Sequence, residues 1–163
     1  MPNNTENTEP IRFYETSDEF GCFSNFSLHP IRLKGKTWPT SEHYFQAQKF
    51  EGSPLAEEIR KVKPPGVAFR LGHSRRKGKL VKDWDRKRDP VMREALYAKF
   101  TQHPELTEIL LSTGGRKIIE HTANDSYWGD GGDGTGRNRL GQLLMELRER
   151  LRKERKSAGF QHE

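Results

Sequence analysis

Residues 38–50 are WPTSEHYFQAQKF, a stretch that combines a strong helix start with a run of aromatic and polar side chains. Thr40 or Ser41 is placed to cap a helix that continues to about Phe50. Comparable start and stop signals recur along the chain. They predict helices that start at Ser53-Pro54, Pro65, Asp89-Pro90, Pro104 and Leu140. The chain is therefore expected to be dominated by helices.

A few short strands complete the pattern. Ile11 to Tyr14, Ile31 to Leu33 and Arg116 to Glu120 are expected to be extended, with a turn at Gly35 after the second of them. A glycine-rich loop covers residues 124–137. The predicted fold class is α+β, a helix-dominated single domain with a few short strands.

Neither an internal repeat nor a linker divides the chain, whose 163 residues fit one domain of common size. The domain is expected to span residues 11–150. Residues 1–10 lack any periodic pattern and are expected to be disordered, and residues 151–163 to form a charged tail in which the last helix frays. Nine Phe, four Tyr and three Trp side chains supply enough area for a compact core, although only 31% of the residues are hydrophobic.

The composition also limits cofactors and location. Cys22 is the single cysteine, which rules out a disulfide within the chain and a thiolate zinc site. The six histidines show no spacing typical of metal ligands, so we expect neither a metal nor a cofactor. With no apolar run long enough to cross a membrane and no signal-peptide pattern at the N-terminus, a cytoplasmic protein is expected.

Positive charge is concentrated in two places. The stretch from Arg70 to Arg88 holds nine basic and two acidic residues, whereas residues 148–163 hold six basic and three acidic ones. The second run alternates charges at helical spacing and is typical of a solvated helix face. The first run is compatible with a phosphate-bearing substrate and equally with a plain basic surface.

The helix predicted over residues 38–50 carries a polar row. At helical spacing Glu42, Gln46 and Lys49 fall on one face, with Phe45 among them, while Tyr44 points elsewhere. A carboxylate, an amide and an amine on one face indicate either a functional site or a solvent-exposed stripe. Ser41-Glu42-His43 is not a catalytic triad, because adjacent helical residues do not face one another.

The glycine-rich loop is the second candidate. Residues 129–134 match G-x-G-x-x-G, but a dinucleotide site needs a preceding strand within a βαβ unit, and Asp130 and Asp133 would repel a pyrophosphate. Two interpretations remain: a tightly bent backbone that presents carboxylates and amides to a ligand, or a flexible surface loop. Trp128 argues against the second, because a large aromatic side chain usually packs.

A third candidate is FSNF at residues 23–26. Asn25 between Phe23 and Phe26 is suited to bonding a base or a sugar hydroxyl, although an asparagine in a loop often stabilises its own turn instead.

Together these motifs resemble the NADAR family, also called the YbiA-like group. The resemblance spans about residues 11–150 and rests on FSNF, on GKTWPTSEHYFQAQKF at 35–50 and on WGDGGDGTGRNRLGQLLMELR at 128–148, with Leu71-Gly72 and Trp84 between them. It implies a helix-rich α+β fold and hydrolysis of N-glycosides. Bacterial YbiA-like members act on ribosylaminopyrimidine 5′-phosphates of riboflavin biosynthesis, and other members remove ADP-ribose from guanine in DNA.

The resemblance and the chemistry suggest site residues. Cleavage of the C–N bond builds oxocarbenium character on the ribose. The catalytic candidates are therefore the carboxylate of Glu42, a second carboxylate from Asp133, which is preferred, or from Asp125 or Asp130, and the amine of Lys49. Stacking is expected from Trp128 or Trp84, with Tyr44 in reserve, and phosphate binding from Arg75, Arg76 and Arg137. The remaining candidates for substrate binding are Asn25, Phe26, Gln46, Gly129, Asp130 and Asn138.

The expected ligand is a small phosphorylated ribosyl-heterocycle. The alternatives are an ADP-ribosyl-guanine glycohydrolase that acts on ADP-ribosylated DNA and a non-catalytic module that binds ADP-ribose or a related nucleotide.

Overall fold

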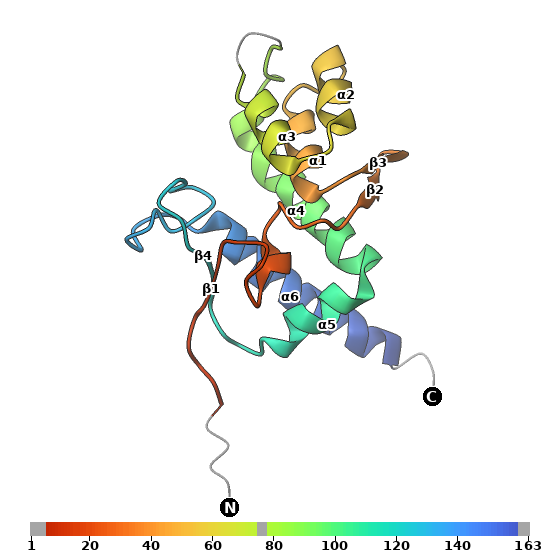
Figure 1. Ribbon diagram of the computed structural model, residues 1–163. Helices are drawn as coiled ribbons and strands as arrows, with labels where there is room; N and C mark the ends of the chain where they lie inside the picture. The colour runs from red at the N-terminus through yellow and green to blue at the C-terminus, as the bar shows by residue number, and fades with distance from the viewer. Residues whose placement is uncertain (1–5, 75–77, 160–163) are drawn as a thin grey trace, which may run out of the picture. The chain divides into compact units, whose positions relative to one another are not determined.

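The computed structural model describes residues 6–74 and 78–159 (Figure 1). Among them, helices far outweigh strands, which confirms the predicted helix-dominated α+β class. The chain divides into two compact units: residues Asn25–Leu106, here called the central unit, and the residues before and after them, here called the terminal unit. The predicted single domain over 11–150 thus contains two separately clustered parts.

The elements occur in the following order. They are β1 (Ile11–Phe13), the 3-10 turn η1 (Gly21–Phe23), β2 (Ile31–Leu33), β3 (Lys36–Trp38), α1 (Ser41–Gln48), α2 (Pro54–Lys61), α3 (Pro65–Gly72), α4 (Trp84–Gln102), α5 (Pro104–Ser112), β4 (Ile118–Glu120) and α6 (Arg139–Gly159).

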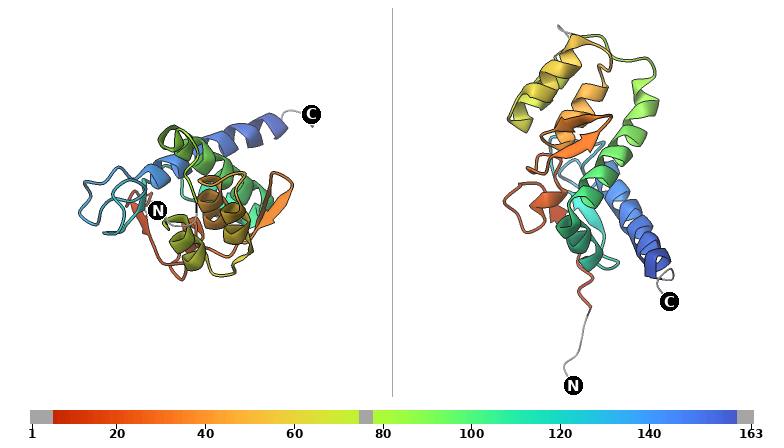
Figure 2. Two further views of the ribbon diagram at one scale, coloured as in Figure 1. Left: turned by 90° about the horizontal axis from the view of Figure 1, so that it is seen from above. Right: turned by 90° about the vertical axis from the view of Figure 1, so that its right-hand side faces the viewer.

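Helix α1 is the innermost element of the central unit, and α2, α3 and α4 pack around it (Figure 2). Every residue from 41 to 50 is buried. The apolar side of α1 joins a core that includes Ile31, Trp38, Tyr44, Phe50, Leu55, Ile59 and Ala95. Because α1 is enclosed by other helices, its polar residues are buried along with its aromatic ones.

The predicted turn at Gly35 is confirmed, but the strand that follows it was not predicted. Strands β2 and β3 form an antiparallel hairpin in which Leu33 lies opposite Lys36. The two connecting residues, Lys34 and Gly35, have φ values of 54° and 73°, as a type I′ turn requires.

Helix α4 starts earlier than the sequence predicts. The expected start was Asp89-Pro90, whereas the helix begins at Trp84 and contains Pro90. Pro90 lacks an N–H and so removes one helical hydrogen bond. The first turn is held from outside, since the Trp84 ring packs 5.3 Å from the Phe45 ring of α1, centroid to centroid. Tertiary packing thus outweighs the local signal of the proline.

In the terminal unit, β1 and β4 pair in parallel, with Ile11 opposite Ile118. Helix α6 packs on β4. It remains helical to Gly159, well past residue 150, and Arg150–Glu154 and Arg152–Glu149 ion pairs lie on its solvated side. Within the described ranges, no helix combines the length and apolar character needed to cross a membrane.

Asn138 connects β4 to the end of the glycine-rich loop. Its Oδ1 accepts from the Glu120 N–H at 3.0 Å, and its Nδ2 donates to the Ile118 carbonyl at 2.9 Å. Its φ of 50° is left-handed, a conformation that asparagine tolerates better than most residues. The side chain is 7% exposed, and both ends of the amide are occupied by β4.

Asn138→Ala is expected to lower the free energy of unfolding by about 3 kcal/mol, because it removes two buried hydrogen bonds and leaves a non-glycine residue at positive φ. Urea denaturation measures the change. The control is Asn124→Ala in the same loop, where the exposed side chain has a weak contact to the Tyr14 hydroxyl at 3.3 Å. Equal midpoints for the two variants would contradict this role of Asn138.

Candidate active site

The start of α1 is fixed by Thr40 and His43. Thr40 caps the helix as predicted, because its hydroxyl accepts from the His43 N–H at 3.2 Å. The His43 ring lies between the same hydroxyl, 2.7 Å from Nδ1, and the Val62 carbonyl, 2.8 Å from Nε2. A carbonyl only accepts, so Nε2 carries the proton and Nδ1 accepts from Thr40. Burial lowers the pKa of His43, and the neutral ring joins α1 to the end of α2.

Asn25, in the FSNF segment, holds the same end of α1 by hydrogen bonds. Its carbonyl accepts from the Glu42 N–H at 3.2 Å, and its Oδ1 accepts from the Ser41 hydroxyl at 2.7 Å. Its Nδ2 lies 3.4 Å from the Met92 sulfur of α4. The expectation that Asn25 stabilises its own turn is therefore wrong. The side chain, 7% exposed, positions the first turn of α1.

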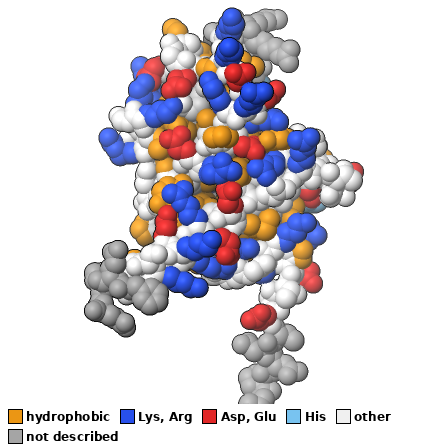
Figure 3. Space-filling model, turned by 180° about the vertical axis from the view of Figure 1, so that it is seen from behind, with side chains coloured by type: hydrophobic (Ala, Val, Ile, Leu, Met, Phe, Trp, Pro, Cys, Tyr) orange, Lys and Arg blue, Asp and Glu red, His pale blue; other side chains and the backbone are white. Residues whose placement is uncertain are grey.

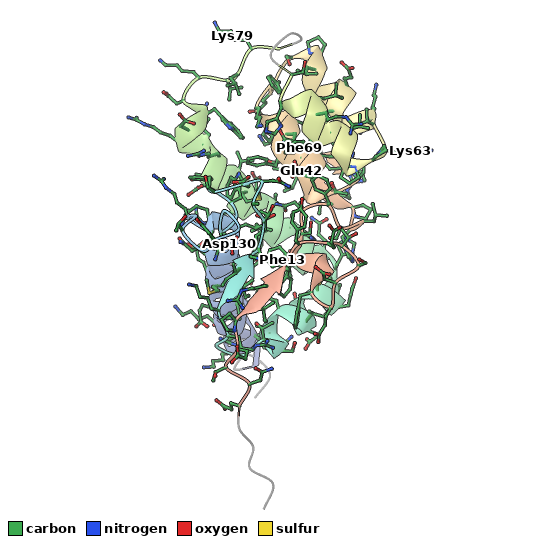
Figure 4. All side chains as sticks on the ribbon, turned by 60° about the vertical axis from the view of Figure 1, so that its left-hand side comes forward. Phe13, Glu42, Lys63, Phe69, Lys79 and Asp130 are labelled. Atoms are coloured by element: carbon green, nitrogen blue, oxygen red, sulfur yellow. The ribbon has the colours of Figure 1, made fainter. Side chains whose placement is uncertain are left out.

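The polar row predicted on α1 is present and enclosed. Glu42, Gln46 and Lys49 are 6%, 2% and 8% exposed, so the solvent-exposed stripe considered above is wrong. Gln46 Nε2 donates to Glu42 Oε1 at 2.7 Å. Figure 4 shows Glu42 among the helices, in contrast to the peripheral Lys63 and Lys79. Burial makes the row chemically distinctive, because a carboxylate and an amine are seldom kept from water without a function.

Lys49 ends the row at the C-cap of α1. Its Nζ lies 3.5 Å from the Gly72 carbonyl of α3 and 5.8 Å from the Phe45 ring centroid. Burial lowers the pKa of Lys49, and the charge of Glu42 offsets part of that effect. A lysine with a depressed pKa is neutral more often than one in water, which is the form needed for attack on a carbonyl carbon.

The aromatic candidates of the central unit differ in exposure. Trp84 is partly exposed beside Phe45, and Phe26 is partly exposed with its ring 6.4 Å from that of Phe69. Tyr44 is fully buried: its ring meets Trp38 edge-on, and its hydroxyl donates to Glu94 at 2.8 Å. Burial raises the pKa of Tyr44. With no exposed face, Tyr44 is a core residue, and its reserve role in stacking is dropped.

The glycine-rich loop of the terminal unit is ordered by its own aspartates. Asp125 Oδ1 accepts from the Tyr127 and Trp128 N–H groups, each at 2.8 Å. Asp130 Oδ1 accepts from Thr122 at 3.1 Å and Gly132 at 2.8 Å. The interpretation as a flexible surface loop is thus at odds with a network that closes the loop from several sides.

His121 is a residue that the sequence analysis did not single out as functional. Its Nδ1 lies 2.7 Å from Oδ2 of the buried Asp130, while half of the histidine side chain is exposed. Burial would raise the pKa of Asp130, but the hydrogen bonds from His121, Gly132 and Thr122 outweigh it and lower that pKa. The pair lies nine residues apart in an irregular loop, a spacing that no local pattern reveals.

The other candidates in the loop differ in their exposure and in their contacts. Asp133 is exposed and accepts from the Thr135 hydroxyl and N–H, which lower its pKa. Trp128 is partly exposed, with its ring perpendicular to that of Tyr127 at 4.9 Å. Arg137 is exposed, with its guanidinium 5.7 Å from the Tyr127 ring centroid. Gly129 is required by packing, because a Cβ there would lie 2.6 Å from a methyl group of Thr122.

The basic stretch from Arg70 to Arg88 is only partly described. Arg75 and Arg76, the first candidates for phosphate binding, lie outside the described residues. Exposed basic side chains elsewhere in the stretch include Arg70, Lys79, Lys82, Arg86 and Lys87. Figure 3 shows one face of the molecule, on which Lys and Arg side chains are interspersed with Asp and Glu. Among the described residues, no three or more His, Cys, Asp or Glu side chains are grouped to hold a metal ion.

Comparison with known proteins defines the family to which the chain belongs. The NADAR domain family matches residues 12–152. N-glycosidase YbiA of Escherichia coli is 60% identical over 141 residues, which cover 86% of this chain and 88% of YbiA. The NMR structure of E. coli YbiA superposes with a TM-score of 0.84 at 58% identity, covering 91% of this chain and 88% of that one. The chain belongs to the NADAR family, and it is a glycosidase.

A more distant relative carries a different name. The chloroplastic riboflavin biosynthesis protein PYRR of Zea mays is 44% identical over 158 residues, which cover 88% of this chain and 25% of the maize protein. The family match and the similarity to YbiA confirm the resemblance to the NADAR family that the sequence suggested.

The burial of the polar row is expected to cost stability. Replacing both charged members at once, by Glu42→Gln with Lys49→Met, removes two buried charges and leaves neither alone. The double variant should unfold with a free energy about 1–3 kcal/mol higher than wild type. Lys49→Met alone should be less stable than the double variant, because it leaves the Glu42 carboxylate without its cation. Urea denaturation of the three proteins measures these differences in the free energy of unfolding. A double variant less stable than wild type would show that Glu42 and Lys49 stabilise the fold.

Proposed function

We propose that the protein hydrolyses the C–N glycosidic bond of ribosylaminopyrimidine 5′-phosphates, intermediates of riboflavin biosynthesis, and releases ribose 5-phosphate. The observation that carries the proposal is the buried row on α1, in which a carboxylate accepts from an amide and lies near a buried amine. The NADAR membership and the riboflavin-related name of the maize relative support this substrate class.

The row suits the chemistry of the bond. As the C1′–N bond breaks, positive charge develops on C1′ and the ring oxygen, and a carboxylate held in a low-dielectric setting stabilises it strongly. In the proposal the negative charge of Glu42 stabilises this positive charge. Glu42 also takes a proton from the attacking water, whose oxygen bonds to C1′. The nitrogen of the heterocycle takes a proton from solvent and leaves as an amine, and Glu42 afterwards returns its own proton to solvent.

The candidates on the glycine-rich loop, which come from the sequence, remain part of the proposal. Asp133 is our preferred second carboxylate, because it is exposed, whereas Asp130 is buried and Asp125 is only partly exposed. Trp84 and Trp128, both partly exposed, are the proposed stacking surfaces for the heterocycle. Arg137 is the described candidate for the 5′-phosphate.

The first test compares wild type with Glu42→Gln on a freshly generated ribosylaminopyrimidine 5′-phosphate, by following the release of ribose 5-phosphate. The variant should lose about 10²-fold or more in rate, the scale expected for an acid/base group. Glu51→Gln is the matched control, because Glu51 lies just beyond the same helix in an exposed pair with Lys34. Equal rates for wild type and Glu42→Gln would remove Glu42 from the mechanism.

A folded wild type that releases no ribose 5-phosphate would overturn the proposed substrate. ADP-ribosylated DNA is then the next substrate to assay, since the exposed basic side chains of the Arg70–Arg88 stretch suit a polyanion. Binding of ADP-ribose without turnover of either substrate would support the non-catalytic module.

Lys49 has two proposed roles, and trapping with borohydride distinguishes them. As a contact to the phosphate or to Glu42, it forms no covalent bond. As a nucleophile, its amine displaces the heterocycle from C1′ of the opened sugar, and water then hydrolyses the imine to ribose 5-phosphate. Borohydride added during turnover should reduce that imine and leave a ribityl 5-phosphate adduct on Lys49, seen by peptide mass spectrometry. No adduct under conditions of active turnover would rule out the nucleophilic role.

A further inference from the structure

Gly72, the last residue of α3, contacts two members of the row on α1, Lys49 and Gln46. Its carbonyl lies 3.5 Å from Lys49 Nζ. On its other side, a Cβ at position 72 would lie 2.0 Å from Gln46 Oε1 and 2.9 Å from Gln46 Cβ. Because even the Cβ of Gln46 is too close, a different rotamer of Gln46 would not make room. Helices α1 and α3 can therefore approach at this point only if residue 72 has no side chain.

The reason for this glycine is packing and not backbone conformation. Gly72 lies within a helix and is absent from the residues with positive φ. Alanine would fit its backbone and would be favoured by helix propensity. The close approach to Gln46 is what requires the missing Cβ.

That approach fixes the orientation of the Gln46 amide. Its Nε2 faces Glu42, while its Oε1 faces Gly72. Within the described part of the chain, Oε1 is buried without a hydrogen-bond donor. A buried acceptor without a donor is unfavourable, so the orientation must be imposed by its surroundings. The Gln46 amide contacts Gly72 on one side and the Glu42 carboxylate on the other. It can therefore adopt one orientation, with its N–H toward Glu42.

We infer that Gly72 and Gln46 are positioning residues, which together hold the Glu42 carboxylate in one rotamer, hydrogen-bonded to the Gln46 amide. The inference rests on the proposed role of Glu42 in glycoside hydrolysis. Gly72 acts through Gln46, and Gln46 acts through Glu42, so neither needs to touch the substrate.

The test is Gly72→Ala, with Gly66→Ala as a matched control on the same helix. At position 66 the nearest atom to an added Cβ is a guanidinium nitrogen of Arg70 at 3.8 Å, an ordinary contact. Gly72→Ala should lower kcat for the ribosylaminopyrimidine 5′-phosphate by about 10²-fold with little change in KM, the effect of a misplaced catalytic group. Gly66→Ala should retain wild-type kcat and KM.

A second variant covers the case in which Gly72→Ala does not fold. Gln46→Met keeps the volume of the side chain and removes the amide, so it should also lower kcat while KM stays near the wild-type value. A rise in KM with unchanged kcat would overturn the inference, since it would make Gln46 a substrate contact. Wild-type kinetics in Gln46→Met or in folded Gly72→Ala would overturn it as well.

NMR separates this inference from the choice of substrate. The side-chain NH₂ signal of Gln46 and the carboxyl carbon signal of Glu42 should both move in Gly72→Ala and stay in place in Gly66→Ala. This result is expected even if wild type fails to cleave the proposed substrate. Unmoved signals in folded Gly72→Ala would overturn the inference independently of catalysis.

Discussion

The hydrogen bond from Gln46 Nε2 to Glu42 Oε1, made inside a helix with no exposed residue, is the constraint around which the central unit is arranged. Thr40 and His43 fix where α1 starts, Asn25 holds its first turn, and Gly72 lets α3 approach its polar side. In the catalytic role proposed for Glu42, the carboxylate needs partners that are already in place, because reorganising them during the reaction would cost rate. The helices around α1 supply that preorganisation.

The terminal unit achieves order by other means. Its loop contains little apolar surface, and its shape depends on side chains that bond to backbone N–H groups: Asp125, Asp130 and Asn138. Glycines allow the chain to turn tightly between them, with Gly131 and Gly132 at positive φ. A loop built this way presents Trp128 and Asp133 on a defined backbone although it contains no regular secondary structure. The half-exposed His121, held at Nδ1 by Asp130, belongs to the same network.

Local signals predicted more of the fold than of the site. The cap at Thr40, the row on α1 and the turn at Gly35 could be predicted, because each depends on residues close together in sequence. The early start of α4 could not, since it depends on Trp84 packing against Phe45. The importance of Gly72 was hidden for the same reason: its contact is with a residue 26 positions away. The fully buried Tyr44 shows the limit of a helical wheel, which gives a direction but not what lies there.

The central claim is that the row on α1 receives a phosphorylated ribose. Titrating ribose 5-phosphate into ¹⁵N-labelled protein tests it without requiring turnover or the reactive substrate. The account predicts that the largest and saturable changes occur at the Gln46 side-chain amide and at the backbone N–H groups of Glu42 and Gly72. Saturable changes confined to other segments, such as the charged end of α6, with the Gln46 signal unmoved, would contradict it.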